Sequence, residues 1–299
     1  MTSLPLGLVK AVRPHQWTKN VLVFAAPVAA GTLFADGVIR NAVVAFAAFC
    51  LAAGGTYLLN DARDVDSDRR HPTKRNRPIA AGVVPVPLAT ALGAVLLITA
   101  VGVATLAPGD GSNYNLAYTI AAYLSLTCAY TFWLKHQPVV DIMAVAAGFV
   151  LRAIAGGAAT EVPISKWFYL VTSAGALFMV VGKRQGEAAE LGADAVALRP
   201  ALAAYTPDFL GYLRSVSSGL LVIAYCLWAF ESASTVANGN GSVFFELSVV
   251  PFLAAVLRYA LLIGEGKGAE PETLVLRDRP LQIAGIAWAI IYGYGLYLA

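Results

Sequence analysis

Four oxygen-bearing side chains lie in one short segment: Asn60, which precedes Asp64 by four positions, and Asp61, Asp64 and Asp68. If the preceding helix continues through them, the three aspartates stand at i, i+3 and i+7 and share one face. Carboxylates this close repel one another unless protons or a cation neutralise them. Magnesium takes oxygen ligands, usually one or two carboxylates together with substrate phosphates. The sequence therefore predicts a magnesium and diphosphate site, with Asp61, Asp64 and Asp68 as the catalytic carboxylates.

The same segment has a second interpretation, as the solvated end of a helix. Its aspartates would then pair with the neighbouring Arg63, Arg69 and Arg70. Charged groups at a membrane boundary are costly and tend to mark function, which favours the metal site. Asp66 has the wrong spacing for that face, so we expect it to point elsewhere.

Basic residues near and inside apolar segments predict where phosphate groups bind. An anionic lipid surface alone would attract the basic run at 69–77, by about 1 kcal/mol per residue. Arg152, however, lies in the middle of an apolar segment and needs a partner, for which Asp141 or a phosphate would serve. Asp141 is about three helical turns away, so a ligand or another helix must lie between the two.

These residues require a scaffold of membrane helices. The chain has 299 residues, of which 58% are hydrophobic and 13% charged, whereas about a quarter of the residues in a soluble domain are charged. Its mean hydropathy is +0.67. The composition excludes a soluble enzyme, a secreted disulfide scaffold and a disordered regulator. Long charge-free stretches fit helices of about 20 residues and do not fit the alternating strands of a membrane barrel.

The predicted fold is an all-α, polytopic membrane helical bundle of about nine transmembrane helices, in a single domain over residues 1–299. The predicted spans are residues 20–36, 41–60, 85–106, 115–134, 139–160, 167–183, 210–230, 243–264 and 281–298.

The basic residues predict the orientation of these spans. Sixteen of the 21 Lys and Arg residues fall on one side, because only Arg40 and Lys166 lie opposite and Arg152, Arg214 and Arg258 lie in or at the edge of spans. Lys and Arg accumulate on the cytoplasmic side. The polar stretches 61–84, 184–208 and 265–280 share that side, so we expect an active site on the cytoplasmic side of the plasma membrane.

The chain resembles the UbiA superfamily of intramembrane prenyltransferases. The resemblance rests on Asn60-Asp61-x-x-Asp64-x-x-x-Asp68 after the second span, on Tyr130-x-x-x-Leu134-Lys135 after the fourth, and on the nine-span plan. It implies a bundle with a cavity open to the cytoplasm and laterally to lipid, in which magnesium holds a diphosphate against the first aspartate motif.

The chain departs from the aromatic prenyltransferases of that family after the sixth span. Those proteins carry a second aspartate-rich motif there, where this chain reads Gly182-Lys183-Arg184-Gln185-Gly186-Glu187. Cations can hold a phosphate that magnesium does not. The site therefore suits a substrate with phosphate at both ends, such as phosphoribosyl pyrophosphate. Together with Arg13-Pro14-x-Gln16-Trp17-x-Lys19-Asn20, the pattern is similar to a branch of the family that transfers phosphoribose.

The resemblance implies transfer of 5-phosphoribose from phosphoribosyl pyrophosphate to a polyprenyl (decaprenyl) phosphate, with release of pyrophosphate, in the synthesis of arabinan precursors for the cell wall. The implied cofactor is Mg²⁺. The implied partners are the two substrates and the membrane, without nucleic acid, and a homo-oligomer stays open. The substrate-binding residues predicted from the pattern and the resemblance together are Lys19, Arg63, Lys74, Arg75, Arg77, Tyr130, Lys135, Asp141, Arg152, Lys183, Arg184 and Glu187.

Two other functions stay open. An aromatic polyprenyltransferase that makes a quinone or haem precursor would need a second metal cluster, which the sequence lacks. A transporter for an anionic solute would also line its path with buried Arg and Asp. Transporters often consist of two related halves, and residues 1–150 and 151–299 show no such relation.

Overall fold

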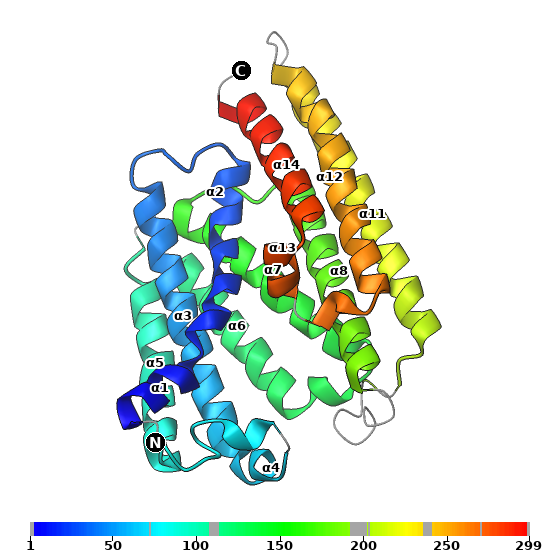
Figure 1. Cartoon of the computed structure of the whole chain (residues 1–299). Coiled ribbons are helices and arrows are strands. Elements are labelled where there is room, and N and C mark those ends of the chain that lie inside the picture. Colours follow the sequence, from blue (N-terminus) through cyan, green and yellow to red (C-terminus); the bar gives the residue numbers. More distant parts are fainter. Residues whose placement is uncertain are drawn as a thin grey trace. The chain divides into compact units, whose positions relative to one another are not determined.

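The computed structural model describes residues 3–71, 73–107, 114–191, 202, 204–235, 241–269 and 271–297, and these form helices and connecting turns without strands. Figure 1 shows the course of the helices. The chain divides into two compact units, and helix α7 (Val140–Thr160) contributes to both. Unit 1 comprises Met1–Phe132 and Leu151–Ile164, and unit 2 comprises Trp133–Val150 and Ser165–Ala299. The predicted all-α fold is confirmed.

Unit 1 is built around the long helix α3. Its elements are α1 (Leu4–Val12), η1 (Pro14–Phe24), α2 (Ala25–Ala29), α3 (Val38–Arg63), α4 (Val65–Arg70), η2 (Lys74–Asn76), α5 (Val86–Ala104), α6 (Tyr114–Phe132) and the second half of α7. Helix α3 packs against α1, η1, α5 and α6. Its approach to α5 is close, because a Cβ on Gly55 would lie 2.8 Å from the carbonyl oxygen of Gly93. Small residues at such contacts let helix backbones come together.

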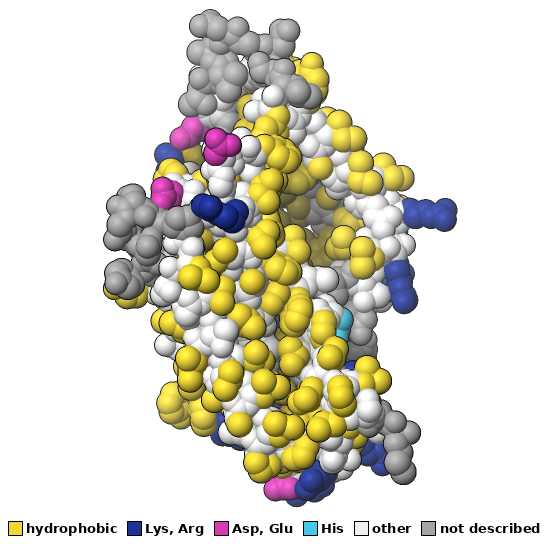
Figure 2. Space-filling model, turned by 90° about the vertical axis from the view of Figure 1, so that its left-hand side faces the viewer, with side chains coloured by type: hydrophobic (Ala, Val, Ile, Leu, Met, Phe, Trp, Pro, Cys, Tyr) yellow, Lys and Arg dark blue, Asp and Glu magenta, His cyan; other side chains and the backbone are white. Residues whose placement is uncertain are grey.

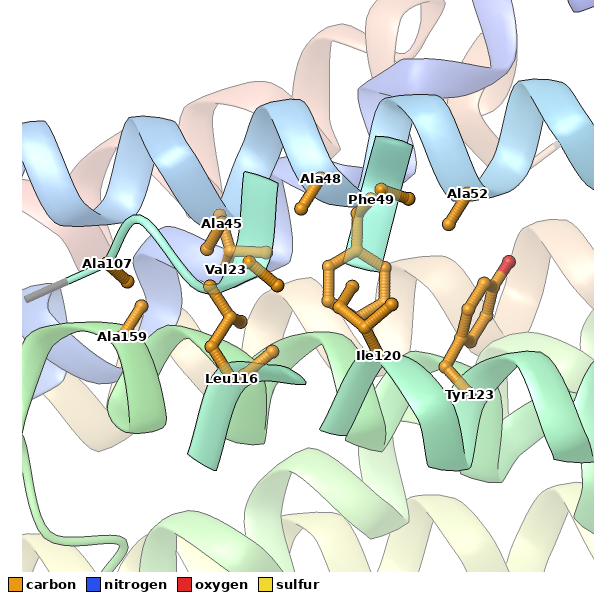
Figure 3. Close-up of a cluster of buried hydrophobic side chains, with 13 residues drawn as sticks. Val23, Ala45, Ala48, Phe49, Ala52, Ala107, Leu116, Ile120, Tyr123 and Ala159 are labelled. Carbon is orange, nitrogen blue, oxygen red and sulfur yellow. The ribbon is translucent and has the colours of Figure 1, made fainter. Parts of the chain in front are cut away.

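The core of unit 1 is made of small and aromatic residues. Figure 3 shows Ala45, Ala48 and Ala52 of α3 in one cluster with Phe49 and with Tyr123 of α6. The rings of Phe49 and Tyr123 lie 5.1 Å apart between centroids. The alanines bring the helices close enough for the two rings to fill the space between them. This core fixes α6 relative to the polar end of α3.

Unit 2 is a second group of packed helices. Its elements are η3 (Leu134–His136), the first half of α7, α8 (Lys166–Leu191), α11 (Pro207–Thr235), α12 (Gly241–Gly264), η5 (Lys267–Ala269), α13 (Pro271–Arg277) and α14 (Arg279–Tyr297). Helix α11 packs between α8 and α12, and α14 packs on α12. The turn η5 lies tightly on α8, because a Cβ on Gly268 would clash with the carbonyl oxygen of Gly182.

Five helices in the described part of the chain are long and apolar enough to cross a membrane. They are Val38–Arg63, Val86–Ala104, Val140–Thr160, Pro207–Ser234 and Ser242–Gly264. They match the predicted spans 41–60, 85–106, 139–160, 210–230 and 243–264. The predicted spans 115–134, 167–183 and 281–298 fall on α6, α8 and α14, which form but lie outside this set of five. The predicted count of nine is therefore not confirmed.

The first predicted span, 20–36, is wrong as a single helix. The helical segment begins earlier, as the 3₁₀ helix η1 at Pro14, and ends at Ala29. Gly31 takes a φ of +71°, and the amide of Thr32 donates to the carbonyl of Pro27, so the chain turns there. Glycine adopts this conformation without steric penalty. The predicted cytoplasmic stretch 184–208 lies partly outside the described residues, Arg199 among them.

The surface of the described helices is strongly apolar. Hydrophobic side chains make up most of the face in Figure 2. On α5, Val95 and Ile98 have 56% and 74% of their surface exposed. Exposed apolar faces of this extent are unusual on a soluble monomer. Contact with lipid explains them, because a spanning helix presents its apolar side chains to the bilayer.

Candidate functional site

The polar end of α3 carries the acidic segment, and the helix does not continue straight through it. Helix α3 ends at Arg63 and α4 begins at Val65, with Asp64 in the turn between them (φ −89°, ψ 11°). The predicted continuous helix through Asp68 is therefore interrupted. The amide of Asp64 still bonds to the carbonyl of Asn60, and the amide of Asp68 to that of Asp64, at 2.9 and 2.8 Å. These bonds join the first turn of α4 to the last turn of α3.

The turn gives the aspartates different surroundings. Asp61 and Asp68 are both 3% exposed, whereas Asp64 is half-buried and has no hydrogen bond or ion pair to another described side chain. Asp66 points away into solvent, as predicted, with its side chain 83% exposed. No group of three His, Cys, Asp or Glu side chains close enough to hold a metal ion occurs among the described residues. The structure thus gathers two of the three predicted carboxylates.

Two arginines donate hydrogen bonds to the two buried carboxylates, those of Asp61 and Asp68. Nη1 of Arg77 donates to Oδ1 of Asp61 at 3.1 Å and to Oδ2 of Asp68 at 2.7 Å. Nη2 of Arg13 donates to both carboxylate oxygens of Asp61, each at 2.7 Å. We call Arg13, Asp61, Asp68 and Arg77 the acidic cluster. The arginine side chains are 23% and 30% exposed and the aspartate side chains 4%, so the positive groups lie toward solvent and the negative groups lie inside.

Local backbone structure places the two arginines. Arg13 ends α1 in the left-handed conformation, with φ of 57°, and its guanidinium lies 4.7 Å from the centre of the Tyr57 ring. Tyr57 stands one helical turn before Asp61 on α3, so both residues hold the same guanidinium. Arg77 is extended (φ −63°, ψ 142°) because Pro78 follows it. Its carbonyl accepts from the amide of Ala81 at 2.8 Å.

The other predicted residues of this segment have separate partners. The amide oxygen of Asn60 accepts from the hydroxyl of Thr131 on α6 at 3.2 Å. The guanidinium of Arg63 lies 4.0 Å from the centre of the Phe132 ring. The alternative pairing of the aspartates with Arg63, Arg69 and Arg70 is therefore found only at the exposed contact of Arg69 with Asp66, at 3.4 Å.

Three further predicted basic residues of unit 1 differ in exposure. Lys74 and Lys19 are half-buried, Arg75 is exposed, and Lys19 donates to the side chain of Gln16 at 2.5 Å.

Arg152 is buried in unit 1 with 8% of its surface exposed. Its Nε donates to Oδ1 of Asn20 at 2.8 Å, and its Nη2 donates to the hydroxyl of Tyr123 at 2.9 Å. The guanidinium also lies 4.7 Å from the centre of the Tyr123 ring. These partners of Arg152 come from η1, which carries Asn20, and from α6, which carries Tyr123.

Asp141 has its own partners in unit 2. Nε of Arg184 donates to Oδ2 of Asp141 at 3.1 Å, and Nη1 of Arg184 donates to Glu187 at 2.8 Å. The side chains of Arg184 and Asp141 are 2% and 1% exposed. Lys183, with 39% of its side chain exposed, lies 3.8 Å from Glu187. We call Asp141, Arg184, Glu187 and Tyr205 the buried cluster.

Tyr205 completes the buried cluster from a segment far along the chain. Its hydroxyl donates to Oδ1 of Asp141 and accepts from the amide of Val139. Val139 has a φ of +67°, a conformation that β-branched residues rarely adopt. Burial, together with the hydrogen bond to Asp141, raises the pKa of the Tyr205 hydroxyl above its ordinary value. The hydroxyl therefore stays protonated and holds the start of α7.

The two remaining predicted residues lie near the ends of elements. Tyr130 is half-buried near the end of α6 in unit 1, and Lys135 is half-buried on η3 in unit 2.

Comparison with known proteins assigns the chain to a family. The sequence profile of the UbiA prenyltransferase family matches residues 21–277. The chain belongs to the UbiA prenyltransferase family. This match includes the acidic segment and all five apolar helices. The chain is therefore an integral membrane protein and an enzyme of the UbiA transferase type.

Curated relatives match this chain over nearly its whole length. Decaprenyl-phosphate phosphoribosyltransferase from Mycobacterium tuberculosis is 46% identical over 295 residues, which cover 97% of this chain and 94% of that protein. Decaprenyl-phosphate phosphoribosyltransferase from Corynebacterium glutamicum is 42% identical over 294 residues, which cover 98% of this chain and 87% of that protein. The curated relatives with high identity and coverage thus carry the activity that the sequence motifs imply.

A solved structure has the same fold. The UbiA homolog from Archaeoglobus fulgidus bound to GPP and Mg²⁺ superposes with a TM-score of 0.68 at 18% identity. The match covers 97% of this chain and 98% of that chain. At this identity the likeness establishes the fold of this chain, which is the all-helical membrane fold predicted from the sequence.

Sequence reasoning missed four residues that the structure places in polar networks: Arg13, Asn20, Tyr123 and Tyr205. Asn20 follows Lys19 at the polar edge of the first predicted span, so its position in the sequence does not indicate that its amide is buried. Arg13 belongs to the motif Arg13-Pro14-x-Gln16-Trp17-x-Lys19-Asn20, but its position in that motif does not indicate which carboxylate it contacts. Tyr123 and Tyr205 have no distinguishing pattern, because their partners lie on other helices.

Proposed function

We propose that this protein transfers 5-phosphoribose from phosphoribosyl pyrophosphate to decaprenyl phosphate, a polyprenyl phosphate, and releases pyrophosphate on the cytoplasmic side of the plasma membrane. The observation that carries the proposal is the 46% and 42% identity with two decaprenyl-phosphate phosphoribosyltransferases over 97% and 98% of this chain. Because these matches run through both units, we treat residues 1–299 as one functional domain.

The acidic cluster fits a magnesium ion by its donor chemistry. Asp61 and Asp68 are buried carboxylates directed at one positively charged atom, Nη1 of Arg77, and carboxylate oxygens are the ligands that Mg²⁺ prefers. We infer that Asp61, Asp64 and Asp68 hold Mg²⁺ with help from Asn60. The Mg²⁺ in the Archaeoglobus homolog supports this choice of metal. A bound Mg²⁺ would neutralise the pyrophosphate and make it a better leaving group.

The arginines of the acidic cluster supply phosphate-binding groups next to these carboxylates. Guanidinium groups bind phosphate oxygens in pairs of parallel hydrogen bonds, so Arg13 and Arg77 would orient the diphosphate. The bond from the ribose C1 to the pyrophosphate oxygen breaks, and an oxygen of the lipid phosphate forms the new bond to C1. No general base is needed, because a phosphate monoester is largely ionised at neutral pH. Catalysis then depends on positioning and electrostatics.

The basic residues of unit 2 fall into two groups by exposure. Lys183 has 39% of its side chain exposed and Lys135 is half-buried, so we propose that these lysines contact phosphate groups. Arg184 is 2% exposed and already bound by two carboxylates. We propose that Arg184, Asp141 and Glu187 act as positioning residues that hold α7 and α8.

Six further predicted residues keep a proposed substrate role. Arg152 and Tyr130 are proposed to act near the ribose or its phosphates, and Lys19, Arg63, Lys74 and Arg75 join Arg77 as candidate phosphate ligands.

Reconstitution tests the proposal directly. Purified protein in lipid nanodiscs receives phosphoribosyl pyrophosphate, decaprenyl phosphate and Mg²⁺, and the release of pyrophosphate and the mass of the lipid product are measured. We expect a phosphoribosylated lipid whose formation stops when EDTA removes the metal. Turnover of a prenyl diphosphate with an aromatic acceptor, without any phosphoribosylated lipid, would instead identify an aromatic prenyltransferase.

A further inference from the structure

Every carboxylate oxygen of Asp61 is already in contact with a guanidinium. Nη2 of Arg13 contacts both of its oxygens at 2.7 Å, and Nη1 of Arg77 contacts Oδ1 at 3.1 Å while it also contacts Asp68 at 2.7 Å. A divalent cation needs the same oxygens. A cation that binds Asp61 therefore competes with a guanidinium that is already bound. Asp64 differs, because it is the one aspartate of the predicted site without an ion pair among the described residues.

The burial of the carboxylates makes this competition strong. The side chains of Asp61 and Asp68 are 4% exposed, and a buried charge that loses its partner is destabilised strongly. Arg77 would therefore leave the two aspartates only when another cation replaces it and another anion receives its guanidinium. A hydrated metal ion alone meets the first condition. A metal ion together with a diphosphate meets both, because guanidinium groups bind phosphate oxygens well.

Arg77 is better placed to move than Arg13. The backbone of Arg77 is held by hydrogen bonds from its amide to Lys74 at 2.9 Å and from the amide of Ala81 to its carbonyl at 2.8 Å. Its side chain is 30% exposed and has no aromatic contact in the described structure. Arg13, in contrast, lies against the ring of Tyr57. A rotation of the Arg77 side chain therefore uncovers Oδ2 of Asp68 and removes one of the two contacts of Asp61 Oδ1, without a change in the fold. Asp61 keeps its contact with Arg13.

We propose that Arg77 is a resident counter-cation that makes metal binding at Asp61 and Asp68 conditional on a diphosphate. Without diphosphate, its guanidinium occupies the position between the two carboxylates. With diphosphate, it moves to the phosphate oxygens and the divalent cation takes its place. The inference rests on the proposed function in one respect, the assignment of these aspartates as metal ligands. It adds that the metal and the diphosphate bind as a pair.

Binding of Mn²⁺ to the full-length protein tests this inference without any turnover. Mn²⁺ serves as the probe, its bound fraction is read by electron paramagnetic resonance, and inorganic pyrophosphate is present or absent. Pyrophosphate also binds Mn²⁺ free in solution. The Asp61→Asn variant, which lacks a proposed metal ligand, measures this background. We expect pyrophosphate to tighten Mn²⁺ binding to the native protein by about tenfold or more, and Mn²⁺ to tighten pyrophosphate binding equally.

The decisive variant is Arg77→Gln. It should bind Mn²⁺ without pyrophosphate about tenfold more tightly than the native protein and should lose most of the pyrophosphate effect. Arg69→Gln is the matched control, because Arg69 contacts Asp66 at an exposed site and should leave Mn²⁺ binding unchanged. Thermal unfolding gives a second readout: Mn²⁺ alone should raise the melting temperature of Arg77→Gln and leave that of the native protein nearly unchanged. If Arg77→Gln does not fold, Arg77→Lys replaces it as the test. Lysine keeps the positive charge but lacks the guanidinium that contacts both aspartates, so Mn²⁺ binding without pyrophosphate should tighten in the same direction by a smaller factor.

The outcomes separate the inference from the proposed function. Native protein that binds Mn²⁺ equally tightly with and without pyrophosphate would overturn the inference and leave the transferase proposal intact. An Arg77→Gln variant that binds Mn²⁺ no better than native protein would do the same. Mn²⁺ binding that Asp61→Asn does not weaken would contradict the metal ligands themselves.

Discussion

The acidic cluster of unit 1 and the buried cluster of unit 2 share one motif, an arginine that joins two carboxylates. Arg77 joins Asp61 and Asp68, and Arg184 joins Asp141 and Glu187. The two differ in the exposure of the arginine, which is 30% for Arg77 and 2% for Arg184.

This difference in exposure separates an exchangeable contact from a fixed one. A partly exposed guanidinium can be rehydrated or can move to another anion at modest cost, whereas a fully buried one has no alternative partner and holds its helices in place. The same residue types at similar distances therefore serve ligand exchange in unit 1 and rigidity in unit 2. Charge alone would assign both arginines to phosphate binding.

The largest expected effect is that of Asp61→Asn on turnover. Removal of a partner that only orients a metal ligand costs 10–100-fold in affinity or activity, so removal of a proposed ligand should lower the rate by at least about a hundredfold. The rate is measured as phosphoribosylated lipid formed per minute in nanodiscs. Asp66→Asn is the control, because Asp66 is exposed and lies outside the proposed site. Equal rates for the two variants would contradict the role of Asp61.

The next effect concerns stability. Arg184→Met leaves the buried carboxylate of Asp141 without its ion partner and should lower the free energy of unfolding by about 3–5 kcal/mol. Chemical unfolding in detergent, followed by circular dichroism, measures the loss. Lys183→Met removes a charge one residue earlier, at a partly exposed position, and should change stability by less than about 1 kcal/mol. Equal losses of unfolding free energy in the two variants would contradict the structural role of the buried Arg184.

A smaller loss is expected for Tyr205→Phe. The change removes a hydroxyl that donates to Asp141 and accepts from the amide of Val139, and unsatisfied buried groups cost about 1–3 kcal/mol. Tyr212→Phe on α11 is the control, because Tyr212 is 63% exposed. Thermal melting of the two variants in the same detergent compares them.

The Tyr205 hydroxyl also gives a pH dependence. Its pKa is raised in the folded state, so its contribution to stability is complete below the ordinary tyrosine value of about 10 and is lost as the pH rises through the folded value. The native protein should therefore become less stable above about pH 10, and Tyr205→Phe should lose less stability over the same range. Parallel pH curves for the two proteins would rule out this titration.

The smallest effect is expected at an ion pair outside both clusters. Arg258 donates to both oxygens of Asp278, and this contact lowers the pKa of the Asp278 carboxyl. The stabilisation is present above the ordinary aspartate value and is lost as the pH falls through the folded value. Asp278→Asn should therefore reduce stability at pH 7 by less than Tyr205→Phe does, and its melting temperature should vary less between pH 5 and pH 3 than that of native protein.

Much of the scaffold is predictable from hydropathy, because the apolar residues of a spanning helix follow one another in sequence. The spans at 41–60, 139–160 and 243–264 match helices Val38–Arg63, Val140–Thr160 and Ser242–Gly264 to within a few residues. The first span was misplaced, since the turn at Gly31 depends on a local φ of +71° that hydropathy does not report. The location of the acidic segment at the end of α3 was also predictable, because its residues are adjacent in the chain.

The sequence by itself determined that the protein is a helical membrane protein, where its carboxylates and basic residues lie, and which family its motifs resemble. Only the tertiary structure decided which arginine holds which carboxylate. Arg13 and Asp61 are 48 residues apart, and Asp141 and Arg184 are 43 apart, so no local spacing rule connects them. Hydropathy and helical periodicity are properties of neighbouring residues, whereas an ion pair and its burial depend on how distant helices pack.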